Sequence, residues 1–214
     1  MGQEVTAADV GTLGKVYLGT ERGTIFSLLS DGSKDSEYSS SIFQPVTSLD
    51  ASNSLRVFVF YKDVSQFEFL ERFSAFPRRY HLTDFGLDRA DGATLGSNNT
   101  IWLLDGKELT QVNPIDHSIL FRYSLDGAGL DAMGRDRVKI EQMILTTSEI
   151  PLKTAGFENQ EKFVPELTYL KVENEDGTTN RLEWPQSNIS FVLFSQNFFH
   201  LVSGEIVMTY QLAE

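Results

Sequence analysis

Three segments of this sequence repeat one pattern, two β-rich runs separated by a short charged break. β-branched and aromatic residues, which are enriched in strands, recur in both runs. The paired runs are residues 15–20 and 24–29, residues 55–61 and 66–72, and residues 100–104 and 108–112. The three segments start about 40 and about 45 residues apart. Hairpins that repeat at this period are typical of β-propeller blades, so the spacing predicts an all-β chain folded as a propeller.

The remaining sequence extends this pattern to five units. We therefore predict a single β-propeller domain over residues 1–214, with five blades of mostly four antiparallel strands. The predicted blades cover residues 3–44, 45–88, 89–130, 131–186 and 187–214.

The second unit is the most regular. Residues 55–61 form a nearly continuous apolar run, which is expected of a strand covered on both faces. Residues 66–73 alternate between apolar and polar side chains, which predicts a half-exposed strand. Residues 78–82 follow a proline and carry charge, and both features are typical of an outer strand.

Three segments depart from the repeat. Residues 30–41 are polar and predict a loop rather than a strand, residues 126–137 are rich in Gly and Asp, and residues 151–165 are interrupted by Pro and Gly. Residues 138–145 fit either a strand or a short helix. Because a repeated scaffold carries its specificity in its loops, we predict the binding surface in the three irregular segments.

Six residues are candidates for contact with a partner because they are large and apolar or aromatic. Phe198 and Phe199 are adjacent, so their rings point to opposite faces of a strand and each needs cover. The full set is Tyr38, Met133, Phe157, Phe163, Phe198 and Phe199.

Composition limits the classes of partner. The net charge is −12, from 30 acidic and 18 basic residues, which disfavours nucleic acid and anionic membrane surfaces. The chain has no Cys, which excludes disulfides and thiolate chemistry. No apolar run approaches the roughly 20 residues that span a bilayer. We therefore expect a protein partner, no nucleic acid and no membrane insertion.

No catalytic, cofactor or metal motif is complete. Residues 84–86 read Asp-Phe-Gly, as in the magnesium motif of kinases, but the other kinase motifs are missing. His81, His117 and His200 lack metal-ligand spacing. We therefore predict no enzyme, no cofactor and no metal. One alternative stays open, a propeller enzyme or small-ligand site built from carboxylates at the central channel. Its candidates are Asp50, Asp63 and Asp105.

Five stretches between residues 15 and 125 resemble a group of small exported β-propeller proteins of Bacteroidota. They are residues 48–53, 57–63, 69–73, 82–87 and 97–105. The resemblance implies a propeller, a periplasmic location after removal of a signal peptide, and no transferable catalytic motif. It also implies a link to the plug protein of the type 9 secretion translocon. We therefore expect a non-enzymatic module that docks on an outer-membrane or secretion-related complex.

Overall fold

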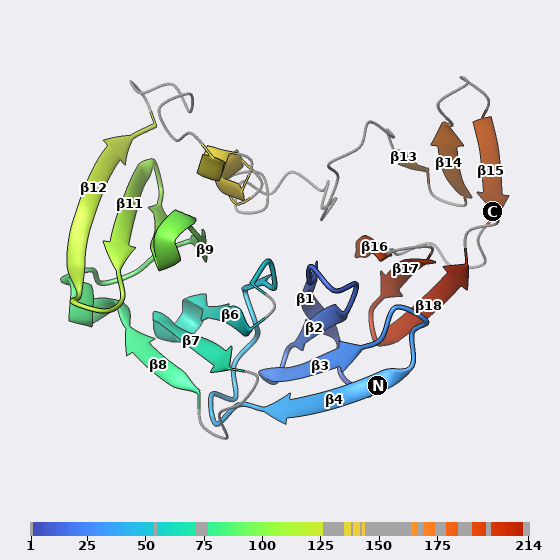
Figure 1. Cartoon of the computed structure of the whole chain (residues 1–214), viewed down its shortest axis with the longest axis horizontal. Coiled ribbons are helices and arrows are strands. Elements are labelled where there is room, and N and C mark those ends of the chain that lie inside the picture. Colours follow the sequence, from blue (N-terminus) through green and yellow to red (C-terminus); the bar gives the residue numbers. More distant parts are fainter. Residues whose placement is uncertain are drawn as a thin grey trace.

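The computed structural model describes residues 2–53, 55–71, 77–125, 135–137, 139–141, 143, 164–166, 169–173, 179–183, 190–195 and 198–211. Within them, strands that are consecutive in sequence pair into antiparallel sheets (Figure 1). This arrangement confirms the predicted all-β propeller class. The number of blades and their boundaries stay predictions.

Three sheets have four strands each. The first contains β1 (Val5–Val10), β2 (Val16–Thr20), β3 (Thr24–Leu28) and β4 (Lys34–Ser39). The second contains β5 (Ser48–Asp50), β6 (Arg56–Tyr61), β7 (Gln66–Glu71) and β8 (Arg78–His81). The third contains β9 (Gly92–Leu95), β10 (Ile101–Asp105), β11 (Glu108–Asn113) and β12 (Ser118–Ser124).

Two further sheets have three strands among the residues described. One contains β13 (Val164–Glu166), β14 (Tyr169–Glu173) and β15 (Thr179–Glu183). The other contains β16 (Phe191–Ser195), β17 (Phe198–Ser203) and β18 (Ile206–Gln211). The short 3₁₀ segments are η1 (Lys62–Val64), η2 (Leu82–Phe85) and η3 (Ser97–Asn99). No helix in the described part of the chain is long and apolar enough to cross a bilayer.

The first strands of four sheets form the inner row of the propeller. β1 contacts β5 on one side and β16 on the other, and β5 contacts β9. The sheets β16–β18, β1–β4, β5–β8 and β9–β12 therefore stand side by side (Figure 1). The C-terminal sheet thus packs against the N-terminal one, while β4, β8 and β12 are largely exposed outer strands.

The core lies between adjacent sheets, and β6 shows why its sequence is continuously apolar. Phe58 and Phe60 belong to the cluster shared with the third sheet, whereas Val57, Val59 and Tyr61 belong to the cluster shared with the first. Successive side chains of a strand point to opposite faces. A strand between two sheets must therefore be apolar at every position, as predicted.

A helical segment covers the outer face of the third sheet. Residues 137, 139–141 and 143 are helical, which answers the open choice between strand and helix for residues 138–145. Ile140 and Met143 pack against Trp102, Leu104 and Leu109. The helix therefore shields an apolar sheet face that a further blade would otherwise shield.

Two predictions about strands were wrong. Residues 30–41 were expected to form a loop, but they contain β4, which pairs with β3. An outer strand bonds on one side only and faces water, so its polar composition imitates that of a loop. β7 was expected to be half-exposed, but Glu68 is 0% exposed, because Tyr61 Oη and Arg79 Nη2 bind its carboxylate at 2.6 and 3.1 Å.

Candidate functional site

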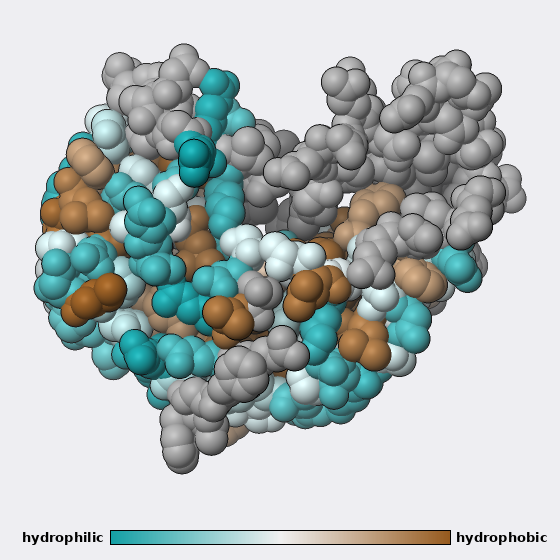
Figure 2. All heavy atoms as spheres, viewed as in Figure 1, coloured by the Kyte–Doolittle hydropathy of each residue, from teal (hydrophilic) through white to brown (hydrophobic). Residues whose placement is uncertain are grey.

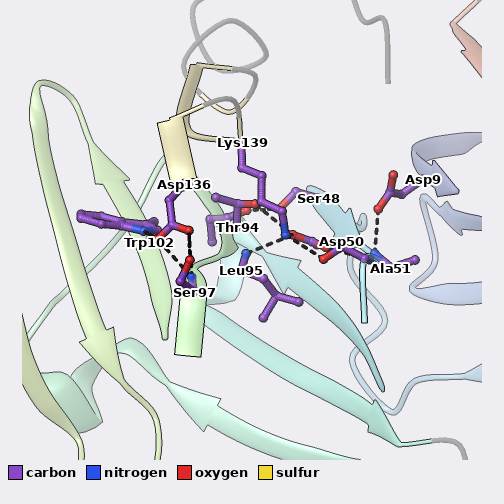
Figure 3. Close-up of polar contacts among 12 residues, drawn as sticks. Asp9, Ser48, Asp50, Ala51, Thr94, Leu95, Ser97, Trp102, Asp136 and Lys139 are labelled. Carbon is purple, nitrogen blue, oxygen red and sulfur yellow. Dashed lines mark hydrogen bonds and ion pairs between the residues drawn. The ribbon is translucent and has the colours of Figure 1, made fainter. Parts of the chain in front are cut away.

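Aspartates at the ends of two inner strands bind the backbone of the next inner strand. At the end of β1, Asp9 Oδ2 accepts a hydrogen bond from the Ala51 N–H at 2.7 Å. At the end of β5, Asp50 Oδ2 accepts from the Leu95 N–H at 3.3 Å and from Thr94 Oγ1 at 3.2 Å. Figure 3 shows both links along one row of strand ends. The same joint therefore recurs from the first sheet to the second and from the second to the third.

A hydroxyl earlier in each inner strand completes the joint. Thr6 Oγ1 donates to the Val46 carbonyl at 2.8 Å, and Ser48 Oγ donates to the Ala93 carbonyl at 2.8 Å. A register shift between Val5 and Ala7 marks a bulge in β1. A bulge inserts one extra residue, which explains why the hydroxyl and the aspartate are one residue further apart in β1 than in β5.

The helical segment is fixed to the same row by two charged side chains (Figure 3). Lys139 Nζ lies 2.8 Å from Asp50 Oδ2 and 2.7 Å from Ser52 Oγ. Asp136 accepts from Ser97 Oγ at 2.6 Å and from Trp102 Nε1 at 2.8 Å. Burial acts to raise the pKa of Asp136, but the hydrogen bonds from Ser97 and Trp102 outweigh it and lower the pKa.

Asp9 has the opposite shift. Burial, together with the negative charge of Asp50, raises the pKa of Asp9 to about 6, against the backbone hydrogen bond from Ala51 and the charge of Lys139. The raised pKa reflects a carboxylate held against a neighbouring carboxylate, with one lysine nearby. In this network the carboxylate oxygens serve as acceptors for backbone and side-chain donors that hold the strands together.

The three carboxylates of the alternative function do not meet at one end of the inner strands. Asp50 ends β5, and the register pairs it with Phe58 in the middle of β6. Asp63 lies in η1 after the end of β6, beside the start of β5. Asp105 ends β10 and pairs with Arg89, whose Nε lies 3.0 Å from its Oδ1. Asp50 is thus at the opposite strand end from the other two.

A cleft of about 490 Å³ opens between the first and second sheets. Ile25 and Val57 form apolar wall, and a polar group lies beside them. In that group, Asp35 Oδ2 binds Lys15 Nζ at 2.7 Å and Ser27 Oγ at 2.8 Å. The hydrogen bonds from Lys15 and Ser27 lower the pKa of Asp35, so the group is an ionised, internally satisfied pair.

Two exposed leucines flank this cleft. Leu13 lies in the β1–β2 loop and is 61% exposed, and Leu55 lies in the β5–β6 loop and is 60% exposed. Tyr17 and Tyr38 also line the cleft. On the face seen in Figure 2, apolar residues stand apart among hydrophilic ones, so two leucines at one opening are a local concentration of apolar surface.

The structure places the predicted contact residues in different environments. Tyr38 is half-buried in β4 and lines the cleft. Phe198 is partly exposed in β17, whereas Phe199 is 6% exposed and stacks on Tyr210 with ring centroids 5.0 Å apart. Met133, Phe157 and Phe163 lie outside the described residues, as do most of the two irregular segments that contain them.

Sequence reasoning overlooked the two rim leucines. Leu13 and Leu55 occupy the loop after the inner strand in successive sheets, at the period of the repeat. A search for apolar residues in loops rather than in strands would have found them. Lys139 was also overlooked, because its partner Asp50 lies 89 residues away and no local pattern connects them.

No protein-family model matches this sequence, and no curated protein gives a significant match. Solved propeller structures resemble it at low identity. Virginiamycin B lyase from Staphylococcus aureus is 16% identical with a TM-score of 0.46, over 100% of this chain and 72% of that chain. The Cps50 (Swd1) β-propeller domain from Myceliophteria thermophila is 9% identical with a TM-score of 0.47, over 98% and 84%. The propeller class assigned to this chain rests on the arrangement of its own sheets.

Proposed function

We propose that this propeller is a non-enzymatic interaction module whose inter-sheet cleft binds a protein partner. The observation that carries the proposal is the cleft itself, with Leu13 and Leu55 exposed at its opening and Tyr17 and Tyr38 in its lining. Aromatic side chains are enriched in the buried centre of protein interfaces. Exposed apolar side chains gathered at one opening are typical of a recognition site.

The inner-strand carboxylates support the same proposal. Asp9, Asp50 and Asp136 direct their oxygens to donors of the chain itself. A ligand site at the channel needs convergent polar groups that face the ligand. The alternative based on Asp50, Asp63 and Asp105 lacks that convergence.

We also propose that the protein works in the periplasm after removal of a signal peptide and docks on an outer-membrane or secretion-related complex, such as the type 9 translocon with its plug. The support is the sequence resemblance to exported propellers of Bacteroidota. The net charge of −12 fits a partner surface with basic residues around an apolar centre.

Site-specific photo-crosslinking in the native host tests the cleft. A photoreactive residue at Leu55 should capture one defined protein, and the same residue at Ile115, which is 82% exposed, should not. Leu13→Gln combined with Leu55→Gln should reduce recovery of that protein at least tenfold, while Ile115→Gln should leave it unchanged. Equal recovery with the double variant would refute the cleft as the binding site. Cell fractionation with a periplasmic marker tests the proposed location.

A further inference from the structure

The C-terminal sheet ends in a strand with an open edge. In sheets β1–β4, β5–β8 and β9–β12 a fourth strand covers the third, whereas β18 is the outermost strand of the sheet β16–β18. Among the described residues, no strand pairs with the outer edge of β18. An edge strand of this kind presents N–H and C=O groups that another strand can bind.

The sequence of β18 is that of a covered strand. Each outer strand carries Lys or Arg: β4 reads KDSEYS, β8 reads RRYH and β12 reads SILFRYS. β18 reads IVMTYQ and has no charged residue, in the manner of the covered strand β3, which reads TIFSL. Charged residues are a common protection of natural edges, and β18 lacks that protection.

We propose that β18 pairs in antiparallel fashion with β18 of a second copy of this chain. The product is a twofold dimer in which the three strands of each sheet β16–β18 join into one continuous sheet. A twofold axis requires a self-complementary surface. Two identical uncharged strands that run in opposite directions satisfy that requirement, and β-branched and aromatic side chains pair favourably across strands.

Charge favours a second copy at this place over other places on the surface. Each chain carries −12, so association through most of the surface brings like charges together. β18 offers an uncharged contact, with Glu205 just before it. Antiparallel pairing places the two Glu205 residues at opposite ends of the new contact, which keeps their repulsion small. This inference does not depend on the cleft or its partner.

Light scattering coupled to size exclusion tests the dimer. The wild type should give twice the chain mass of 24.1 kDa at high concentration and fall toward that mass on dilution. Ile206→Lys places a charge on the edge, at a residue that is 46% exposed, and should weaken dimerisation at least tenfold. Ile115→Lys makes the same change at a residue that is 82% exposed and away from the edge, and should leave the dimer intact. A monomeric wild type, or a dimer that survives Ile206→Lys, would overturn the proposal.

Hydrogen exchange on the wild type keeps the test informative if Ile206→Lys does not fold. Amides of β18 should become more protected as the protein concentration rises, while amides of the outer strand β12 should not change. Protection of β18 that is independent of concentration would mean that another segment of the same chain covers the edge. Protection that appears only when a different protein is added would assign the edge to that protein. Either result would overturn the pairing of two copies.

Discussion

Replacing Lys139 by Met tests whether the helical segment stabilises the inner strands. The Lys139 Nζ lies 2.8 Å from Asp50 Oδ2, and the two side chains are 33% and 8% exposed. Removing one partner of a buried ion pair costs about 3–5 kcal/mol, whereas an exposed pair contributes about 0–1 kcal/mol. Met preserves much of the apolar stem, so the change mainly removes the charge.

The expected loss lies between these two limits. After the substitution, Asp50 still accepts hydrogen bonds from the Ser52 and Leu95 N–H groups and from Thr94. Lys139 is also partly solvated, which screens the pair. We therefore expect Lys139→Met to lower the free energy of unfolding by about 1.5–2.5 kcal/mol.

Urea denaturation monitored by tryptophan fluorescence measures this loss, because Trp102 lies in the same network and donates to Asp136. Lys34→Met is the matched control. Lys34 pairs with Glu37 at 2.6 Å, but the two side chains are 58% and 40% exposed, so we expect a loss below about 0.5 kcal/mol. Equal losses for Lys139→Met and Lys34→Met would refute the structural role of Lys139. Adding Asp50→Asn to Lys139→Met should restore part of the stability, because no unpaired charge is then buried.

Two further substitutions test the carboxylate network and the core. The pKa of Asp9 is raised from 3.8 to about 6, so the folded state binds a proton more readily than the unfolded state, and stability should fall as pH rises from about 4 to about 6. The full shift corresponds to about 3 kcal/mol, which partial exposure of Asp9 reduces to about 1–2 kcal/mol; Asp9→Asn should abolish this slope in urea titrations between pH 4 and 7, and an unchanged slope would contradict the assignment. Phe67→Ala, at a residue that is 0% exposed, should cost about 3–5 kcal/mol, whereas Phe43→Ala, at a residue that is 80% exposed, should cost less than about 0.5 kcal/mol. Similar melting temperatures for these two variants would place Phe67 outside the core.

The covered strands of the regular sheets could be predicted from sequence, and the polar or long-range elements could not. β6 is apolar throughout because sheets cover both of its faces, and this pattern is visible without a structure. β4 escaped because an outer strand needs no apolar face. Glu68 in β7 looked solvent-facing because its partners Tyr61 and Arg79 cannot be assigned from alternation alone.

The candidate site divides in the same way. Tyr38 was singled out from the sequence and lines the cleft, although the segment around it was taken for a loop. Leu13 and Leu55 were readable in principle, because each follows an inner strand at the repeat period. The contact of Lys139 with Asp50 depends on a helix that interrupts the repeat, so the repeat contains no information about it.

The joints between inner strands have a consequence for how such a chain can lengthen. In each joint one strand supplies a hydroxyl and a carboxylate, and the next strand supplies only main-chain N–H and C=O groups. Every sequence has those main-chain groups, so the receiving strand needs no matching side chain. A duplicated unit would therefore carry its own attachment and find an acceptor already present in its neighbour. Mutational tolerance should accordingly be one-sided, low at Thr6, Asp9, Ser48 and Asp50 and higher at the positions that they bind.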